Sequence, residues 1–293
     1  AMLKKADIGV GLYLLAAVVF FIVPIPSILL DVMLAINISI ALIILFNVLF
    51  AKEVLDMSFF PTLLLFTTIF RISLNVSSTR LILLTGDPGN VVRTFGSFVG
   101  GGNMVVGTIV FIVLVLIQFI VINKGSERVS EVTARFTLDA MPGKQMAIDA
   151  DLSSGLINEQ EAKLRRNKIQ RESDFYGAMD GATKIVKGDA IMSIIITSIN
   201  FIAGSIIGIV QSGMGLSEVL SVYSIATIGD GLVSQLPALM ISTATGMIVT
   251  RAVSEGSLNN DVIKQFLAQP QSLMIAGLIL AVFAIFPGTP HIQ

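Results

Sequence analysis

Two polar residues inside an apolar stretch are the first candidates for chemistry. Arg71 and Asn75 lie within the apolar run 59–84 and would share one face of a helix. An arginine at membrane depth costs at least about 2.5–3.5 kcal/mol unless it is paired or hydrated. We therefore expect this face to be directed toward protein or water, and we favour an ion path over an arginine that reaches the membrane surface or caps a buried polar network. The face also carries Thr67, Thr68, Ser78 and Thr79.

Two aspartates elsewhere could bind and release a proton or coordinate a cation. Asp230 stands between two glycines within the apolar run 219–250, which indicates either a broken span lining protein or water, or a water-exposed turn. Asp189 lies where a charged segment returns to an apolar one, five residues after Lys184. Anchoring on the cytoplasmic side accounts for the lysine but not for Asp189, which suits an ion pair at a pore mouth.

Three other positions have simpler interpretations. Asp31 opens the second apolar stretch, where a negative charge stabilises a helix N-terminus, and it is a secondary candidate for the ion path. Gly204 and Gly208 have the spacing that typically marks close helix packing in membranes.

Charge is scarce along the 293 residues and unevenly placed. Only 13% of the residues are charged, about half the fraction in a soluble domain, and residues 124–189 hold 22 of the 39 charges. An apolar body thus carries one charged insert, which argues against a soluble enzyme. A net charge of −1 gives no basic surface for nucleic acid, and the absence of cysteine with one histidine, His291, argues against thiol catalysis and zinc. We expect no enzymatic activity, no metal and no cofactor.

The apolar runs predict an all-α polytopic membrane protein with about seven transmembrane helices and a small helical cytoplasmic insert. The basic residues that flank the spans place the N-terminus and the insert in the cytoplasm. We divide the chain into a first membrane block of four spans (1–123), the insert (124–189) and a second block of three spans (190–293). The expected spans are 8–23, 29–50, 59–84, 104–122, 190–210, 219–250 and 272–286.

Within the insert we expect helices over about 127–137 and 159–175. Asn158 with Glu161 resembles a capping box, and Glu161 with Arg165 forms an i,i+4 pair. The glycines of 177–188 indicate a less regular return to the membrane. A small apolar set would pack the insert against its neighbours: Val129, Val132, Phe136, Ile169, Phe175 and Tyr176.

Long motifs resemble the flagellar and virulence type III export-gate family, the FHIPEP family. The resemblance runs from about residue 6 to the end, and 174–177 looks flagellar. The motifs are 71–83 (RISLNVSSTRLIL), 134–151 (ARFTLDAMPGKQMAIDAD), 174–189 (DFYGAMDGATKIVKGD) and 227–237 (TIGDGLVSQLP).

The resemblance implies a membrane component of the export apparatus in the bacterial inner membrane at the flagellar base. It implies a nonameric ring beside other export-gate proteins, which uses protons or sodium ions to drive export of flagellar proteins. The suspected ion path would include Arg71, Lys184, Asp189 and Asp230, and Asp149 with Asp151 match a further acidic pair. The family has eight spans followed by a cytosolic docking domain, so we expect this sequence to be its N-terminal membrane portion.

Two alternatives to ion coupling stay open. In the first, the spans only build a ring scaffold and the charged insert makes subunit contacts. In the second, the chain is a small-molecule secondary transporter, although the 66-residue insert and the lack of an evident repeat weigh against this class.

Overall fold

The computed structural model describes residues 2–100 and 104–251, and a few single residues between 268 and 278. In these ranges the chain is helical and contains no strand. The elements are α1 (Met2–Ile22), α2 (Ser27–Phe50), η1 (Val54–Met57), α3 (Phe60–Thr85), α4 (Asn90–Gly100), α5 (Met104–Ile117), η2 (Gln118–Asn123), α6 (Lys124–Asp139), α7 (Met141–Ser153), α8 (Glu159–Val210) and α9 (Leu216–Thr250).

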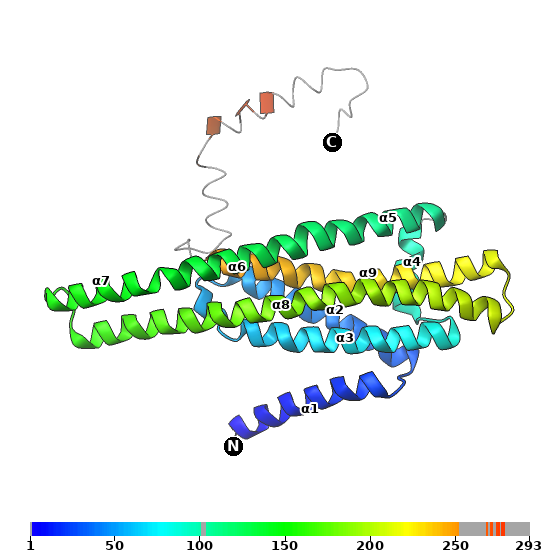
Figure 1. Ribbon diagram of the computed structural model, residues 1–293, viewed down its shortest axis with the longest axis horizontal. Coiled ribbons are helices and arrows are strands. Elements are labelled where there is room, and N and C mark those ends of the chain that lie inside the picture. Colours follow the sequence, from blue (N-terminus) through cyan, green and yellow to red (C-terminus); the bar gives the residue numbers. More distant parts are fainter. Residues whose placement is uncertain are drawn as a thin grey trace.

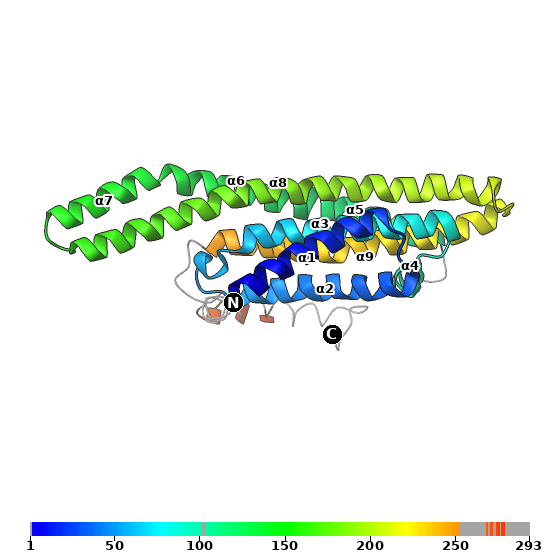
Figure 2. The ribbon, with the colours of Figure 1, turned by 90° about the horizontal axis from the view of Figure 1, so that it is seen from below.

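Most of the long helices run along a common direction (Figure 1). α4 crosses this direction at one end, while α7 and the first part of α8 extend beyond the other helices at the opposite end (Figures 1 and 2). The bundle thus has a short covering helix at one end and a projecting helical hairpin at the other.

Five helical segments in the described part are long and apolar enough to cross a membrane: Ser27–Phe50, Val54–Thr85, Val105–Ser153, Glu159–Val210 and Leu216–Thr250. A shorter apolar helix covers Gly11–Ile22. Each of these six segments overlaps one of the first six expected spans, although two of them continue into the charged insert. The seventh expected span, 272–286, lies mostly outside the described residues. The all-helical, multi-span class is therefore supported, whereas the count of seven stays a prediction.

The largest apolar cluster joins the bundle to the insert. Val48 of α2, Leu64 of α3 and Ile248 of α9 pack in one cluster with Phe175 and Tyr176 of α8. The insert therefore leans on the membrane helices, as expected. Phe136 and Val129 are exceptions, because their side chains are 70% and 39% exposed. Ile169 packs in a separate cluster with Met141, Ile148 and Ala162.

The expected end of the insert helix near residue 175 is wrong, because α8 continues without interruption to Val210. Each glycine in a helix interior costs roughly 0.5–1 kcal/mol relative to alanine. Burial of Tyr176, Met179 and Val186 against the bundle offsets that cost. The N-terminus was predicted correctly, since the Asn158 side chain accepts a hydrogen bond from the backbone N–H of Glu161 at 2.8 Å.

Residues 90–100 form a helix that the sequence analysis did not anticipate. The Asp31 carboxylate of α2 accepts hydrogen bonds from the backbone N–H groups of Asn90 and Val91, at 3.0 Å each. It therefore caps α4. The expected role of Asp31 at the N-terminus of its own helix is wrong, because Asp31 lies beyond the first turn of α2. These two bonds help to hold α4 where it packs against α9 near Ile225 and Gly229.

Candidate functional site

Seven buried polar residues on three helices form what we call the polar seam. Its members are Arg71, Asn75 and Ser78 of α3, Asp189 and Asn200 of α8, and Asp230 and Ser234 of α9. Spacings of three, four and eleven residues keep the members on one face of each helix. The sequence thus brings a polar stripe from each of three helices into contact at the centre of an apolar bundle.

Arg71 and Asp189 form a buried ion pair, with each side chain only 2% exposed. The bond joins Nη2 of the arginine to Oδ2 of the aspartate. Two ions taken out of water cost several kcal/mol each unless geometry and hydrogen bonds compensate. Removal of either partner leaves the other charge buried and unpaired. Each residue therefore depends on the other for its stability in the buried, charged form.

The pair borders a small cavity of about 20 Å³. Nε and Nη1 of Arg71 and Oδ1 of Asp189 are buried without a hydrogen-bond partner among the described residues. A cavity of 10–15 Å³ is enough for one water that has polar partners. The remaining lining includes Gln118, Ser193, Ser234 and Gln235, so the cavity is polar enough to be hydrated.

Asp230 is held by two donors on the neighbouring helices. The Ser78 hydroxyl donates to Oδ1, and Nδ2 of Asn200 donates to Oδ2 at 2.9 Å. The carboxylate is 4% exposed, so it is buried and not part of a water-exposed turn. The hydroxyl of Ser234 lies 2.7 Å from Oδ1 of Asn75 and links this carboxylate's helix to α3.

The expected interruption of the chain at the two glycines beside Asp230 is wrong, because α9 runs continuously from Leu216 to Thr250. The glycines instead permit close packing. A Cβ on Gly229 would overlap the carbonyl oxygen of Val92 in α4, and a Cβ on Gly231 would overlap the ring of Phe111 in α5. α4 and α5 therefore pack closely against α9 at the two residues that flank Asp230 in the sequence.

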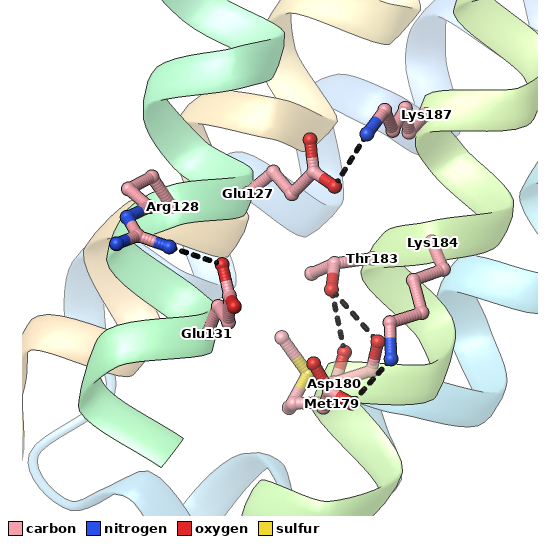
Figure 3. Close-up of polar contacts among 8 residues, drawn as sticks. All are labelled: Glu127, Arg128, Glu131, Met179, Asp180, Thr183, Lys184 and Lys187. Carbon is pink, nitrogen blue, oxygen red and sulfur yellow. Dashed lines mark hydrogen bonds and ion pairs between the residues drawn. The ribbon is translucent and has the colours of Figure 1, made fainter. Parts of the chain in front are cut away.

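Lys184 does not join the polar seam. Its side chain is 66% exposed and pairs with Asp180 at 2.8 Å, on the part of α8 before the apolar segment (Figure 3). This hydrogen bond raises the pKa of the Lys184 amine, so the lysine stays charged. The structure brings Arg71 and Asp189 together, but it leaves Lys184 at the surface.

The remaining candidate residues join helices to one another and lie outside the polar seam. Asp149 pairs with Arg166, and Asp151 lies 3.4 Å from Arg165, so both aspartates join α7 to α8 in the projecting hairpin. Gly204 and Gly208 lie against the ring of Tyr223, where a Cβ at either position would overlap that ring.

Asn200 and Ser234 are partners in the polar seam that were not predicted from the sequence. One signal was present, because Ser234 lies one helical turn after Asp230. Among the described residues no group of three or more His, Cys, Asp or Glu side chains could hold a metal ion.

A helical membrane protein with buried charges at the contact of its spans is the class that this fold and site define. The FHIPEP family profile matches residues 17–293, and the chain belongs to this family. Its relatives include the flagellar biosynthesis protein FlhA of Bacillus subtilis, 56% identical over 97% of this chain and 42% of that protein. FlhA of Caulobacter vibrioides is 50% identical over 98% of this chain and 42% of that protein.

A relative outside the flagellar group is the low calcium response locus protein D of Yersinia pestis, 48% identical over 99% of this chain and 41% of that protein. The chain thus spans about two fifths of the length of these curated relatives. No solved structure matches it significantly.

Proposed function

We propose that this chain is the membrane portion of a flagellar type III export component that couples ion movement to protein export. The relatives named as flagellar biosynthesis proteins support the export role. In this proposal copies of the chain form an oligomeric ring in the bacterial inner membrane, beside other export-gate proteins. Flagellar proteins are the exported substrates, and protons or sodium ions are the coupling ions.

The observation that carries the coupling proposal is the Arg71–Asp189 pair beside a hydratable cavity. A charge buried within membrane helices is a functional candidate by default, because it is costly to keep there. In this proposal Asp189 binds a proton and releases it, and Arg71 is its charged partner. Asp230 acts as a second carboxylate further along the seam, and the Ser234 hydroxyl links the Asp230 backbone carbonyl to Asn75. Each elementary charge that crosses 100 mV supplies about 2.3 kcal/mol.

The test replaces Asp189 or Asp230 by Asn in the full-length protein and measures export of flagellar proteins. We expect export to fall at least tenfold for each variant at normal protein abundance, because Asn cannot bind and release a proton. Asp180→Asn is the matched control, since Asp180 is a surface carboxylate on the same helix as Asp189. Unchanged export in both seam variants would remove the basis for ion coupling.

A ring scaffold without ion conduction is the second candidate. The observation in its favour is that Asp230 already has hydrogen-bond donors from two helices, as expected for a residue that only joins them. The scaffold account predicts that Asp230→Asn keeps export intact, because Asn still accepts from Ser78. The two proposals therefore give opposite outcomes for one variant.

A further inference from the structure

Two small cavities lie one after the other between α8, α9 and the helical stretch α5–η2–α6. We call the space between these helices the groove. The cavity beside Arg71 and Asp189 is bounded by 190–194 of α8, by 234–238 of α9 and by 115–119 of α5 and η2. A second cavity of about 10 Å³ is bounded by 183–187 of α8, by 242–245 of α9 and by Ser126 and Glu127 of α6.

The two cavities lie on one continuous face of each helix. Ala238 and Ser242 of α9, which line the first and the second cavity respectively, are four residues apart. Four residues are about one helical turn, a rise of roughly 6 Å. On α8 the two linings meet at Val186, Lys187, Asp189 and Ala190. The second cavity is therefore the next polar space along the groove, on the side of the charged insert.

The second cavity contains one charged pair from two elements. Nζ of Lys187 donates to Oε1 of Glu127 at 2.9 Å, and the carboxylate side chain is only 23% exposed (Figure 3). Four hydroxyl-bearing residues complete its lining: Ser126, Thr183, Ser242 and Thr245. Its volume is at the lower limit for a single water. A titratable carboxylate, a cation and hydroxyl groups thus surround a space of this size.

The other charges nearby are on the surface. Arg128 and Glu131 pair with each other on α6, and Lys184 pairs with Asp180 on α8 (Figure 3). Their side chains are mostly more exposed than that of Glu127, and none of the four lines either cavity. Glu127 is therefore the carboxylate of this cluster with a direct place in the groove.

We propose that Glu127, held by Lys187, is the proton-binding group between Asp189 and the cytoplasm. This inference rests on the proposed coupling function. A proton leaves the Asp189 carboxyl group for water in the first cavity, and the Glu127 carboxylate accepts it through the second cavity. Glu127 then releases the proton to cytoplasmic water and becomes ionised again, so each carboxylate returns to its starting state.

The experiment measures proton entry in cells that carry the full-length protein and the complete export apparatus. A pH-sensitive fluorescent protein reports cytoplasmic acidification, normalised to the amount of assembled protein. We expect Glu127→Gln to lower this flux at least tenfold, because Gln keeps the shape but cannot carry a proton. Glu127→Asp retains a titratable group and should retain flux within about threefold. Glu131→Gln is the matched control, one turn along α6 and outside both cavities, and should leave flux unchanged.

Normal flux per copy in Glu127→Gln would overturn the proposal, as would an equal loss in Glu131→Gln. If Glu127→Gln fails to accumulate, Thr183→Val decides, because it removes a hydroxyl from the second cavity and leaves Glu127 in place. Flux per copy should then fall severalfold, and unchanged flux would overturn the inference. Thr197→Val controls for loss of a hydroxyl on α8 away from both cavities.

Asp189→Asn, measured in parallel, distinguishes a failure of the proposed Glu127 role from a failure of the proposed ion coupling. If Asp189→Asn abolishes flux and Glu127→Gln does not, the proton path leaves the seam elsewhere and only the role of Glu127 fails. If both variants conduct normally, the proposed coupling function fails as well.

Discussion

At the scale of single residues, the buried ion pair is the feature with the largest energetic consequence. Breaking a buried pair by removing one partner costs about 3–5 kcal/mol, whereas replacing both partners by apolar residues of similar volume is often neutral or stabilising. Arg71 and Asp189 are both buried in the same contact, so this asymmetry applies to them directly.

We therefore expect Arg71→Met to lower the thermal unfolding midpoint of the purified full-length protein more than Arg71→Met with Asp189→Leu. The single variant strands a carboxylate, and the double variant strands no charge. Export should be lost in both, because neither retains the pair. Equal stability of the two variants would show that Asp189 is hydrated without Arg71.

Some of the candidate residues could be predicted from the sequence, but the contacts between them could not. Arg71, Asp189 and Asp230 stood out because charges are costly among apolar residues, and the structure buries all three. The contact of Arg71 with Asp189 could not be predicted, since 118 residues separate them and pairing depends on the packing of α3 with α8. For the same reason Lys184, near Asp189 in sequence, could not be assigned to the surface beforehand.

At the scale of elements, α4 depends on two close fits to the rest of the protein. A Cβ on Gly96 would overlap the carbonyl oxygen of Ile225 in α9, and one on Gly229 would overlap that of Val92. Both helices therefore need glycine where their backbones touch. A pattern of apolar residues does not reveal such a contact, which is why residues 90–100 were not expected to form a helix.

Gly229→Ala should destabilise the protein by about 1–3 kcal/mol, the usual cost of added bulk in a packed site. Gly181→Ala is the matched control, because an added Cβ there meets no atom within 4 Å and alanine favours the helix. Thermal unfolding of both variants measures the difference. A midpoint for Gly229→Ala equal to that of Gly181→Ala would contradict the packing of α4 on α9.

Asp31→Ala should loosen α4 without unfolding the bundle. The two capping bonds to Asn90 and Val91 would be lost, and loss of a helix cap costs about 0.5–2 kcal/mol. Hydrogen exchange of residues 90–100 should become faster, while exchange in α8 should stay the same. Asp31→Asn keeps an accepting oxygen and should preserve more protection than Asp31→Ala.

At the scale of the whole molecule, the charge distribution predicts the orientation in the membrane. The basic residues predict a cytoplasmic hairpin of α7 and α8, and an outer turn between α8 and α9. Composition was sufficient to predict a helical membrane protein with one charged insert. It could not show that α8 continues without interruption from the insert to Val210. Glycines at 177, 181 and 188 suggest a break in the helix, but packing against the bundle keeps this segment helical.

These 293 residues contain no cysteine, so a single cysteine introduced here is the one labelling site within them. Ser154→Cys, at the turn between α7 and α8, should react only when a membrane-impermeant reagent reaches the cytoplasm. Ser212→Cys, at the turn between α8 and α9, should react from outside in intact spheroplasts. The reverse pattern, or labelling of both from one side, would contradict the predicted orientation.

The central claim is that the polar seam carries ions, and proton entry through Asp189→Asn protein tests it most directly. Cytoplasmic acidification per assembled copy should fall at least tenfold against the unmodified protein, with Asp180→Asn unchanged. Acidification at the unmodified rate, at equal abundance of assembled protein, would contradict the claim and leave the seam as a structural contact between three helices.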